Sequence, residues 1–298
     1  MTPGEHTALI EDLIARLLDS YVFPEVAVEL EKALRTSDFL DGLAPDELAM
    51  ALTLTLQDVS KDKHLWVRYR ETPYPPPQAD GRPTPEEIEN MRREAAAENF
   101  GFASVAILGN NLGYLDLRGF APPQWAGPKI AAAMTLLSDT QALIIDLRNN
   151  GGGSPETVAL FCSYFFPAEP IIHLNSIYNR PEDRTEDFFT IPALPAPRYL
   201  GKPVYLLTSS YTFSGAEEFA YNLKNLQRVT IVGEITGGGA HPVEFQRLMV
   251  PHFLLAIPNA RAINPLTGTN WEGVGVHPHI QVPADDALDL ALQKILTP

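Results

Sequence analysis

The 298-residue chain contains a single cysteine, Cys162. An intrachain disulfide is therefore impossible, and a cysteine-based metal cluster is excluded as well. Cys162 lies inside the apolar run 159–166, where a thiol behaves as a small core hydrophobe. We therefore predict a structural role for this residue.

Basic residues are also scarce. The chain has 22 Lys and Arg against 37 Asp and Glu, a formal net charge of −15, and no cluster of basic residues. A nucleic-acid-binding protein needs a basic surface to neutralise phosphates, and anionic membranes attract cationic segments. The composition thus argues against nucleic-acid and anionic-membrane partners.

Long apolar runs are absent too. None reaches the roughly 20 residues that a membrane-spanning helix needs. The first residues, 1–6, contain no basic region followed by an apolar run and a cleavage site, so no secretory signal is expected. From these features we predict a cytoplasmic protein without a membrane span.

The N-terminal third is helical in pattern. Apolar residues recur at helical spacing over 9–18, and further helices are expected over 26–34 and 46–56, before an alternating strand at 64–69. We predict a helical cap domain at 1–70 that ends in this strand. Residues 71–101 follow as a proline-rich linker and a charged helix that starts at Pro85.

From residue 102 strands and helices alternate. A hairpin is expected from 103–108 and 112–117, and the segment 142–147 is a continuous apolar run typical of a strand buried on both faces. Further strands are expected at 204–207 and 229–232, helices at 130–137, 156–165 and 216–226, and a late β segment at 248–257. Such alternation is typical of an α/β layer, so we predict an α/β catalytic core over 102–298.

The junction at Ser214-Gly215 is the most informative local feature. A strand enters a Ser/Thr-rich turn, and a helix-like run begins directly after Ser214. A serine in this position is lifted away from the core, while the Gly215 N–H and the helix N-terminus face whatever the hydroxyl attacks. The alternative is an ordinary helix N-cap, a position that serine also favours.

Two glycine-rich loops follow other strands. Gly151, Gly152 and Gly153 can form a nest of N–H groups that binds an anion or oxyanion, although a tight turn is the alternative. The loop lacks the Walker and dinucleotide-binding spacings. Gly237, Gly238 and Gly239 form the second loop. Together with Ser214, both loops fit one substrate-binding cleft at the ends of the strands.

The histidines give little support to a metal site. His277 and His279 are close in sequence, but no cysteine or spaced carboxylate accompanies them. We predict no metal and no cofactor. His64, taken by itself, has the pattern of a structural histidine.

Four motifs together resemble the C-terminal processing peptidase family, which includes the tail-specific proteases, the tricorn protease core and the repeats of interphotoreceptor retinoid-binding protein. The motifs are 146–153 (DLRNNGGG), 214–217 (SGAE), 232–239 (VGEITGGG) and 271–278 (WEGVGVHP), in the family's order. The likeness to the retinoid-binding-protein branch also takes in the N-terminal helices and KDKHLWVRY at 61–69, so it covers nearly the whole chain.

The resemblance implies a crotonase-like or ClpP-like α/β core with the N-terminal helices as a cap. It implies that Ser214 is the nucleophile and that Gly215, with a glycine of 151–153, supplies the oxyanion N–H groups. The tail-specific branch uses a lysine where this chain has Gly239, so a Ser–Lys dyad is excluded there. The tricorn-like branch uses a histidine and a glutamate, and His64 and Glu272 match those positions.

Some features depart from the family pattern. Lys63 stands where the tricorn core has a serine before its histidine, and His279 follows Pro278 where the family often has aspartate. No PDZ-like segment is apparent between cap and core. These departures weaken the inference, drawn from the family, that this protein selects substrates by their C-termini.

The favoured interpretation is a serine peptidase or related acyl hydrolase that acts on a peptide or protein through Ser214, His64 and Glu272. A non-catalytic protein that binds a retinoid, fatty acid or other apolar ligand is the second interpretation, with the aromatic stretches 161–166 and 248–257 as pocket linings. A third is an α/β enzyme that uses the oxyanion hole for lyase or isomerase chemistry. The natural substrate and the oligomeric state do not follow from the sequence.

Overall fold

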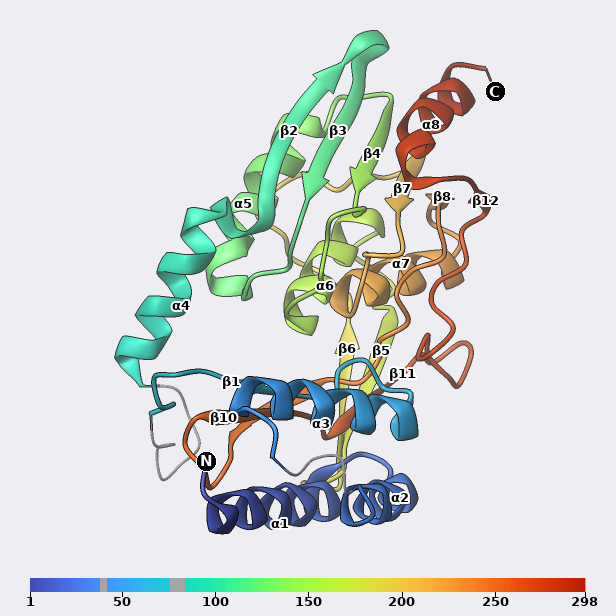
Figure 1. Cartoon of the computed structure of the whole chain (residues 1–298). Coiled ribbons are helices and arrows are strands. Elements are labelled where there is room, and N and C mark those ends of the chain that lie inside the picture. Colours follow the sequence, from blue (N-terminus) through green and yellow to red (C-terminus); the bar gives the residue numbers. More distant parts are fainter. Residues whose placement is uncertain (38–41, 76–83, 298) are drawn as a thin grey trace. The chain divides into compact units, whose positions relative to one another are not determined.

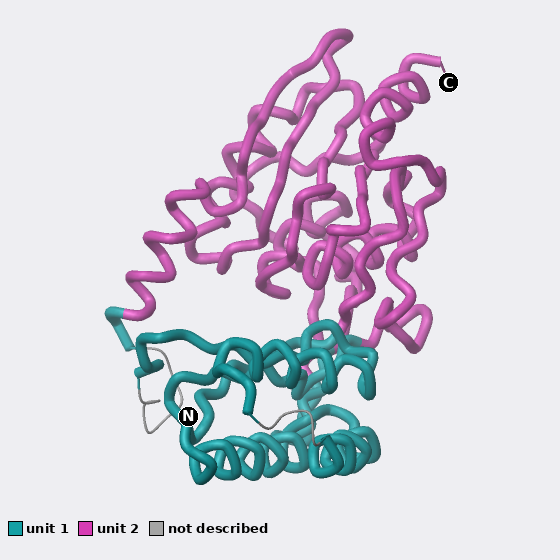
Figure 2. The backbone as a smooth tube through the Cα atoms, viewed as in Figure 1, with its two compact units in different colours: residues 1–86, 177–185, 241–262 teal, residues 87–176, 186–240, 263–298 magenta. Residues whose placement is uncertain are grey.

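The structure, a computed structural model, describes residues 1–37, 42–75 and 84–297 (Figure 1). The chain folds into two compact units, coloured separately in Figure 2. Unit 1 consists of residues 1–86, 177–185 and 241–262, and unit 2 consists of 87–176, 186–240 and 263–298. Unit 1 thus contains two later segments that a linear division of the sequence places with the core.

Unit 1 is built on three helices: α1 (Pro3–Ser20), α2 (Pro24–Arg35) and α3 (Pro45–Ser60). Each begins with proline, whose fixed φ suits the first helical position and whose missing N–H would have no helical partner there. The helical spacing predicted for this part of the chain is confirmed, because the apolar stripe is buried. Its fully buried members include Leu9, Leu13, Leu17, Leu30, Leu48, Leu52 and Leu56.

An antiparallel sheet completes the core of unit 1. Its order is β1 (Trp66–Tyr69), β10 (Phe253–Pro258) and β9 (Val243–Arg247). Val67, Phe253, Leu255 and Ile257 pack in the same cluster as the helices. The late β segment expected at 248–257 is present as β10, which begins after the turn at Pro251.

Residues 177–185 join unit 1 through Arg180. Its guanidinium donates from Nη1 to the Tyr21 carbonyl at 2.7 Å and from Nη2 to the Leu18 carbonyl at 2.9 Å. These two carbonyls lie at the C-terminal end of α1, where backbone acceptors lack helical partners. A charged side chain from a distant segment therefore caps this helix.

Unit 2 is organised around a six-stranded sheet of order β12-β8-β7-β4-β3-β2. Neighbouring strands are parallel, except that β2 pairs antiparallel with β3 in the predicted hairpin. All residues of β4 are buried, as the continuous apolar run predicted. The strands are β2 (Phe102–Leu108), β3 (Leu112–Leu117), β4 (Ala142–Asp146), β7 (Val204–Thr208), β8 (Thr230–Gly233) and β12 (Ile280–Gln281).

Helices cover both faces of this sheet (Figure 1). Ala287 and Ala291 of α8 pack with Ile144 on one face. On the opposite face, Gly113 lies against Leu137 of α5. The mixed α/β architecture expected for this part is confirmed. The helices are α4 (Pro85–Ala97), α5 (Pro123–Leu137), α6 (Pro155–Cys162), α7 (Gly215–Asn225) and α8 (Ala287–Leu296), with short 3-10 turns at Asn99–Gly101, Gly109–Asn111, Ser163–Phe165 and Ala284–Asp286.

A third sheet has the order β11 (Ala260–Ile263), β5 (His173–Asn179) and β6 (Arg184–Phe189). The boundary between the two units falls within each of these strands along the chain. The proline-rich linker expected after residue 71 falls partly on 76–83, outside the described residues. Across the described part of the chain, no helix has both the length and the apolar character needed to cross a membrane.

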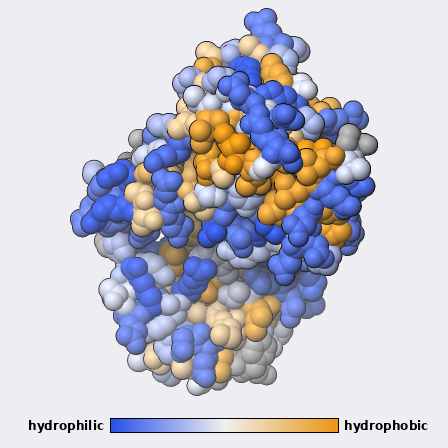
Figure 3. All heavy atoms as spheres, turned by 90° about the horizontal axis from the view of Figure 1, so that it is seen from above, coloured by the Kyte–Doolittle hydropathy of each residue, from blue (hydrophilic) through white to orange (hydrophobic). Residues whose placement is uncertain are grey.

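Apolar side chains are also found at the surface (Figure 3). In unit 2, Ile107, Leu136 and Leu296 are about half exposed. Folded proteins commonly expose apolar atoms, so such residues do not identify a ligand by themselves.

Candidate active site

The turn that carries Ser214 follows the C-terminal end of β7 in unit 2. Ser209 Oγ donates to the Arg148 carbonyl at 2.5 Å, and Thr212 Oγ1 donates to the Leu147 carbonyl at 2.8 Å. The Phe213 N–H donates to the Asn150 carbonyl at 3.1 Å. The Ser/Thr-rich composition is thereby explained, because hydroxyl groups attach this turn to the first glycine-rich loop.

Ser214 has an unusual backbone conformation, with φ 54° and ψ −123°. A non-glycine residue rarely has positive φ, and such strain costs on the order of 1–3 kcal/mol and is concentrated at functional sites. The Ser214 N–H donates to Glu217 Oε2 at 2.9 Å, while no capping bond from the Ser214 hydroxyl occurs within the described chain. The N-cap interpretation therefore does not account for the hydroxyl.

Glu217 is fully buried and connects the turn that carries Ser214 to the second glycine-rich loop. Besides the Ser214 N–H, its carboxyl group accepts hydrogen bonds from Thr236 Oγ1 at 2.5 Å, the Gly238 N–H at 2.7 Å and the Gly239 N–H at 2.8 Å. Burial raises the pKa of Glu217, and these hydrogen bonds oppose that rise. Because every contact is a donor, the site fits an ionised carboxylate.

The adjacent Glu218 is in the opposite situation. It is also buried, and burial raises the pKa of Glu218 to about 8, although the amides of Asn175 and Asn222 oppose the shift. At neutral pH this carboxyl group is therefore protonated. Two neighbouring glutamates on α7 thus differ in protonation, because Glu217 accepts four hydrogen bonds, three of them from backbone N–H groups, whereas burial dominates at Glu218.

This contrast predicts opposite effects of the same substitution. Glu217→Gln brings amide hydrogens against N–H donors and should lower the free energy of unfolding by about 2–3 kcal/mol at pH 7. Glu218→Gln replaces a neutral acid by a neutral amide in the folded state, and it removes the proton that the wild-type chain releases on unfolding at pH 7. This variant should therefore raise the free energy of unfolding at that pH rather than lower it. Urea denaturation of both variants measures the difference, and equal losses would contradict the two protonation states.

The pH dependence of stability gives a second readout for Glu218. Its folded-state pKa lies above the ordinary value of 4.5, so between about 4.5 and 8 the unfolded state releases a proton that the folded state retains. The stability that this group contributes is fully present below pH 4.5 and is lost as pH rises towards 8. Glu218→Gln should remove this part of the pH slope.

The first glycine-rich loop follows β4. Asp146 pairs with the Arg148 guanidinium, Nη2 to Oδ2 at 2.6 Å, and accepts a hydrogen bond from the Tyr114 hydroxyl at 2.8 Å. The fully buried Asn150 donates from Nδ2 to the Leu117 carbonyl and accepts from the Gly152 N–H at 2.8 Å. The polar residues of this motif shape the loop, and the Gly152 N–H is already engaged.

Glycine is required where this loop approaches Ser214. A Cβ atom on Gly152 would lie 2.7 Å from the Gly215 nitrogen and 2.8 Å from the Ser214 Cβ. A Cβ on Gly153, where φ is 140°, would lie 2.1 Å from the Phe120 carbonyl oxygen. Close backbone approach therefore explains why one glycine would not suffice here.

Gly153→Ala should consequently destabilise the protein by on the order of 3 kcal/mol, because the added methyl group meets backbone and the φ is unfavourable. Gly151→Ala is the matched control, since its Cβ would meet only the Tyr211 hydroxyl at 3.9 Å. Chemical denaturation of both variants tests this expectation. A similar loss in the two variants would contradict it.

The second glycine-rich loop uses its N–H groups internally. Gly237 donates to the Thr212 carbonyl at 2.9 Å, and Gly238 and Gly239 donate to Glu217. A substrate-binding role for these three glycines remains a prediction, and it would have to use other atoms of the loop.

Glu272 lies in unit 2 on a loop that packs against this second glycine loop. Its Oε2 accepts from the Ala240 N–H at 2.5 Å, and the neighbouring Trp271 donates from Nε1 to the Gly239 carbonyl at 2.7 Å. The Gly273 N–H donates to the Gly238 carbonyl at 3.0 Å. Unit 2 by itself therefore brings together Ser214, both glycine loops and the segment that carries Glu272.

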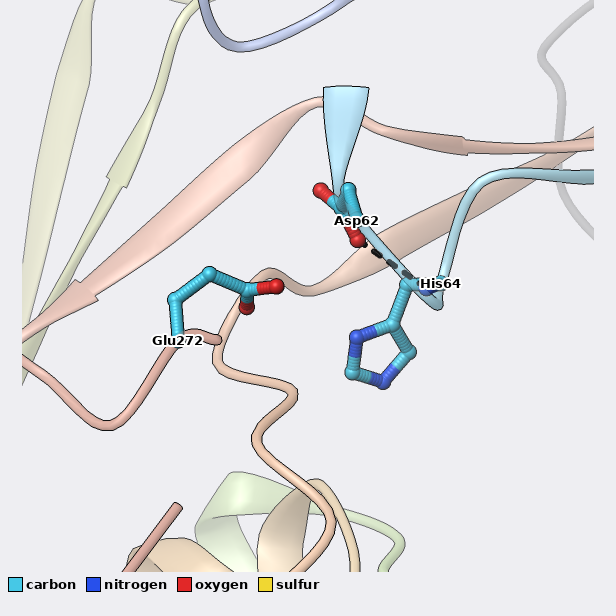
Figure 4. A group of neighbouring side chains, drawn as sticks. All are labelled: Asp62, His64 and Glu272. Carbon is cyan, nitrogen blue, oxygen red and sulfur yellow. Dashed lines mark hydrogen bonds between the residues drawn. The ribbon is translucent and has the colours of Figure 1, made fainter. Parts of the chain in front are cut away.

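His64 belongs to unit 1. It lies in the turn between α3 and β1, two residues before the strand, whereas the alternating pattern had predicted a strand from residue 64. Its backbone N–H donates to Asp62 Oδ1 at 2.9 Å (Figure 4). Burial lowers the pKa of His64 to about 4, although the Asp62 carboxylate opposes the shift. The imidazole is therefore neutral at pH 7 and able to accept a proton.

The comparison with known protein families decides the identity. Residues 111–282 match peptidase family S41, and residues 4–99 match the N-terminal domain of peptidase S41 in eukaryotic IRBP. The chain belongs to peptidase family S41. The resemblance seen in the sequence motifs is thereby confirmed. Only residues 100–110 lie between the two matched ranges, too few for a further domain such as PDZ at that point.

Three known proteins are similar to this chain, each over a different share of its length. The tail-specific protease of Haemophilus influenzae is 25% identical over 150 residues, which are 50% of this chain and 20% of that protein, so the chain spans about a fifth of that relative. A putative peptidase from Parabacteroides merdae has 18% identity and a TM-score of 0.67, with 98% and 97% of the two chains covered. The photosystem II D1 C-terminal processing protease has 15% identity and a TM-score of 0.56, covering 96% and 94%. These solved structures share the fold.

The remaining sequence candidates have structural roles. His279 Nδ1 accepts from the Ile231 N–H at 2.9 Å, so this ring supports strand β8. Cys162 is buried, and burial raises its thiol pKa, which fits the predicted core residue. Sequence reasoning missed the bridging role of Glu217, although this residue stands in the quoted motif SGAE.

Proposed function

We propose that this S41 family member is a serine peptidase in which Ser214 is the nucleophile, His64 the general base and Glu272 the carboxylate that orients and stabilises the imidazole. The observation that carries the proposal is the strained backbone of Ser214. That strain holds, at a helix start beside the glycine loop that precedes α6, a serine whose hydroxyl makes no capping bond among the described residues. The nucleophile and the base come from different units of the chain.

The proposed reaction is acyl transfer to water. Ser214 Oγ attacks the substrate carbonyl carbon while His64 takes its proton, and N–H groups of Gly215 and of Gly151 or Gly153 stabilise the oxyanion. The protonated His64 then donates this proton to the leaving amine as the C–N bond breaks. His64 next deprotonates a water molecule, which attacks the acyl carbon. The acyl C–O bond then breaks, His64 returns the proton to Ser214 Oγ, and the acid leaves.

The peptide substrate class is supported by the family. The aromatic stretch 161–166, considered as a lining for an apolar ligand, is core instead: Phe161 is fully buried and stacks on Phe219 with ring centroids 5.1 Å apart. Leu248, Phe253 and Leu255 belong to the core of unit 1. Packing therefore accounts for both stretches, which favours hydrolysis over storage of an apolar ligand.

Glu272→Gln tests the carboxylate role. The glutamine oxygen can still accept the Ala240 N–H, so the loop should keep its shape, while the negative charge that stabilises a protonated His64 is lost. We expect kcat to fall by about 10²–10⁴-fold with little change in KM. Steady-state cleavage of a fluorogenic peptide measures this, and an unchanged kcat would overturn the role of Glu272.

A further inference from the structure

Unit 1 contains a buried histidine–carboxylate pair whose two residues are not members of the proposed triad. His241 Nδ1 is 2.7 Å from Asp62 Oδ2, and the two side chains are 4% and 1% exposed. The two residues are 179 positions apart in the sequence. Burying a carboxylate is unfavourable unless donors surround it, so a pair of this kind has to be explained.

Asp62 satisfies this requirement through both oxygens. Oδ1 accepts from the His64 backbone N–H at 2.9 Å. Oδ2 accepts from the Tyr21 hydroxyl at 3.3 Å and meets His241 Nδ1. A carboxylate oxygen only accepts hydrogen bonds, so the short contact between Oδ2 and Nδ1 requires the His241 tautomer that carries its proton on Nδ1 if the two groups are to bond. The buried carboxylate thus joins His241 to the backbone of His64.

The turn that carries His64 depends on this carboxylate. α3 ends at Ser60, and its C-cap residue Lys61 has the left-handed conformation, with φ 58°. The Asp62 side chain then closes an Asx-type turn on the His64 N–H, and the Leu65 N–H donates to the Asp62 carbonyl at 3.2 Å. A rotation of the Asp62 carboxylate would release the His64 backbone N–H, so the orientation of this carboxylate holds the backbone that carries the His64 side chain.

His241 is itself held in place. Its ring packs edge-on against Phe23 with centroids 5.3 Å apart. In the sequence it directly follows the second glycine loop and Ala240. Two aromatic neighbours, Phe23 by packing and Tyr21 by hydrogen bonding, therefore restrict the His241–Asp62 pair to one geometry.

We propose that His241 is a positioning residue for the acyl-transfer reaction. It fixes the Asp62 carboxylate through its Nδ1–H, and Asp62 in turn fixes the turn that presents His64. The inference rests on the proposed role of His64 as general base. His241 acts through Asp62 and does not touch the substrate.

Two substitutions of His241, similar in shape at the δ position, test whether a hydrogen-bond donor is needed where Nδ1 lies. His241→Asn places an amide N–H₂ where Nδ1 lies, and His241→Leu places a methyl group there. We expect the second-order rate of labelling by a fluorophosphonate, and kcat for a peptide, to stay within about 3-fold of wild type in the Asn variant. They should fall about 100-fold in the Leu variant with KM unchanged, as for a displaced catalytic group.

Other outcomes overturn the inference. Wild-type rates in His241→Leu would show that the pair does not position His64. Loss of labelling in His241→Asn as complete as in His241→Leu would show that His241 acts directly on the reaction. His64→Ala separates the two proposals. If labelling survives that change, the assignment of His64 as the base fails. If His64→Ala abolishes labelling but His241→Leu leaves it at the wild-type rate, the positioning role of His241 fails.

The wild-type protein offers a readout that does not depend on the stability of any variant. NMR of protein with ¹⁵N-labelled histidine should show Nδ1 of His241 protonated, the resonance being assigned by its absence in His241→Asn. An unprotonated Nδ1 would overturn the proposal, because His241 would then donate no hydrogen bond to Asp62.

Discussion

Ser214→Ala is expected to reduce peptide turnover by about 10⁴–10⁶-fold, the scale on which loss of a nucleophile acts in serine peptidases. Its free energy of unfolding should change by less than about 0.5 kcal/mol. Among the described residues, no capping bond comes from the Ser214 hydroxyl, and alanine suffers the same backbone strain as serine. Peptidase assays and urea denaturation of the purified variant measure the two quantities.

Ser154→Ala provides the matched control. Ser154 caps α6, and its hydroxyl oxygen accepts from the Thr157 N–H at 3.3 Å. Its loss should cost about 1 kcal/mol of stability and leave turnover intact. If Ser214→Ala instead lost stability and retained activity, Ser214 would be a capping residue and the assignment of the nucleophile would fail.

His64→Ala should lower kcat/KM by a similar factor, because no other neutral imidazole is assigned to the Ser214 proton. The pH profile of the wild type is the sharper test. Burial lowers the pKa of His64 to about 4, so the base is neutral from about pH 5 upwards and becomes protonated, and inactive, only as pH falls through 4. kcat/KM should therefore be flat between pH 5 and 7 and fall below that range.

The exposed His277 is the control for this measurement, and His277→Ala should leave both the rate and the profile unchanged. An acidic limb centred near 6.5, the ordinary histidine value, would contradict a buried His64 as the base in the free enzyme. Residual activity in His64→Ala near the wild-type level would contradict the assignment directly.

Much of the architecture could be predicted because local pattern and burial agree. The apolar stripe of α1 and the continuous apolar run of β4 can leave water only by packing into a core, and both are buried as expected. Strand β5 escaped prediction, since its residues His173–Asn179 include polar Asn175 and Ser176 that are nevertheless buried. The assignment of 241–262 to unit 1 depends on the pairing of β10 with β1, a long-range contact that no local pattern encodes.

The site could be predicted in part for the same reason. The turn at Ser214 and the glycine loops follow local patterns, since a strand–turn–helix junction and close backbone approach leave few alternative residues at these positions. Their catalytic roles stay a prediction. The roles of Glu217 and Asp62 could not be read, because each depends on donors distant in sequence, such as Gly239 and His241. The alternating pattern at 64–69 predicted a strand from His64. The hydrogen bond from the His64 N–H to the Asp62 side chain forms a turn there instead.

The most direct test of the central claim is labelling of the wild-type protein and of Ser214→Ala with a fluorophosphonate, read by intact mass. The account predicts a single covalent adduct on the wild type, at Ser214, and none on the variant. An adduct that persists in Ser214→Ala, or a wild-type protein that cleaves peptides without forming one, would contradict Ser214 as the activated nucleophile.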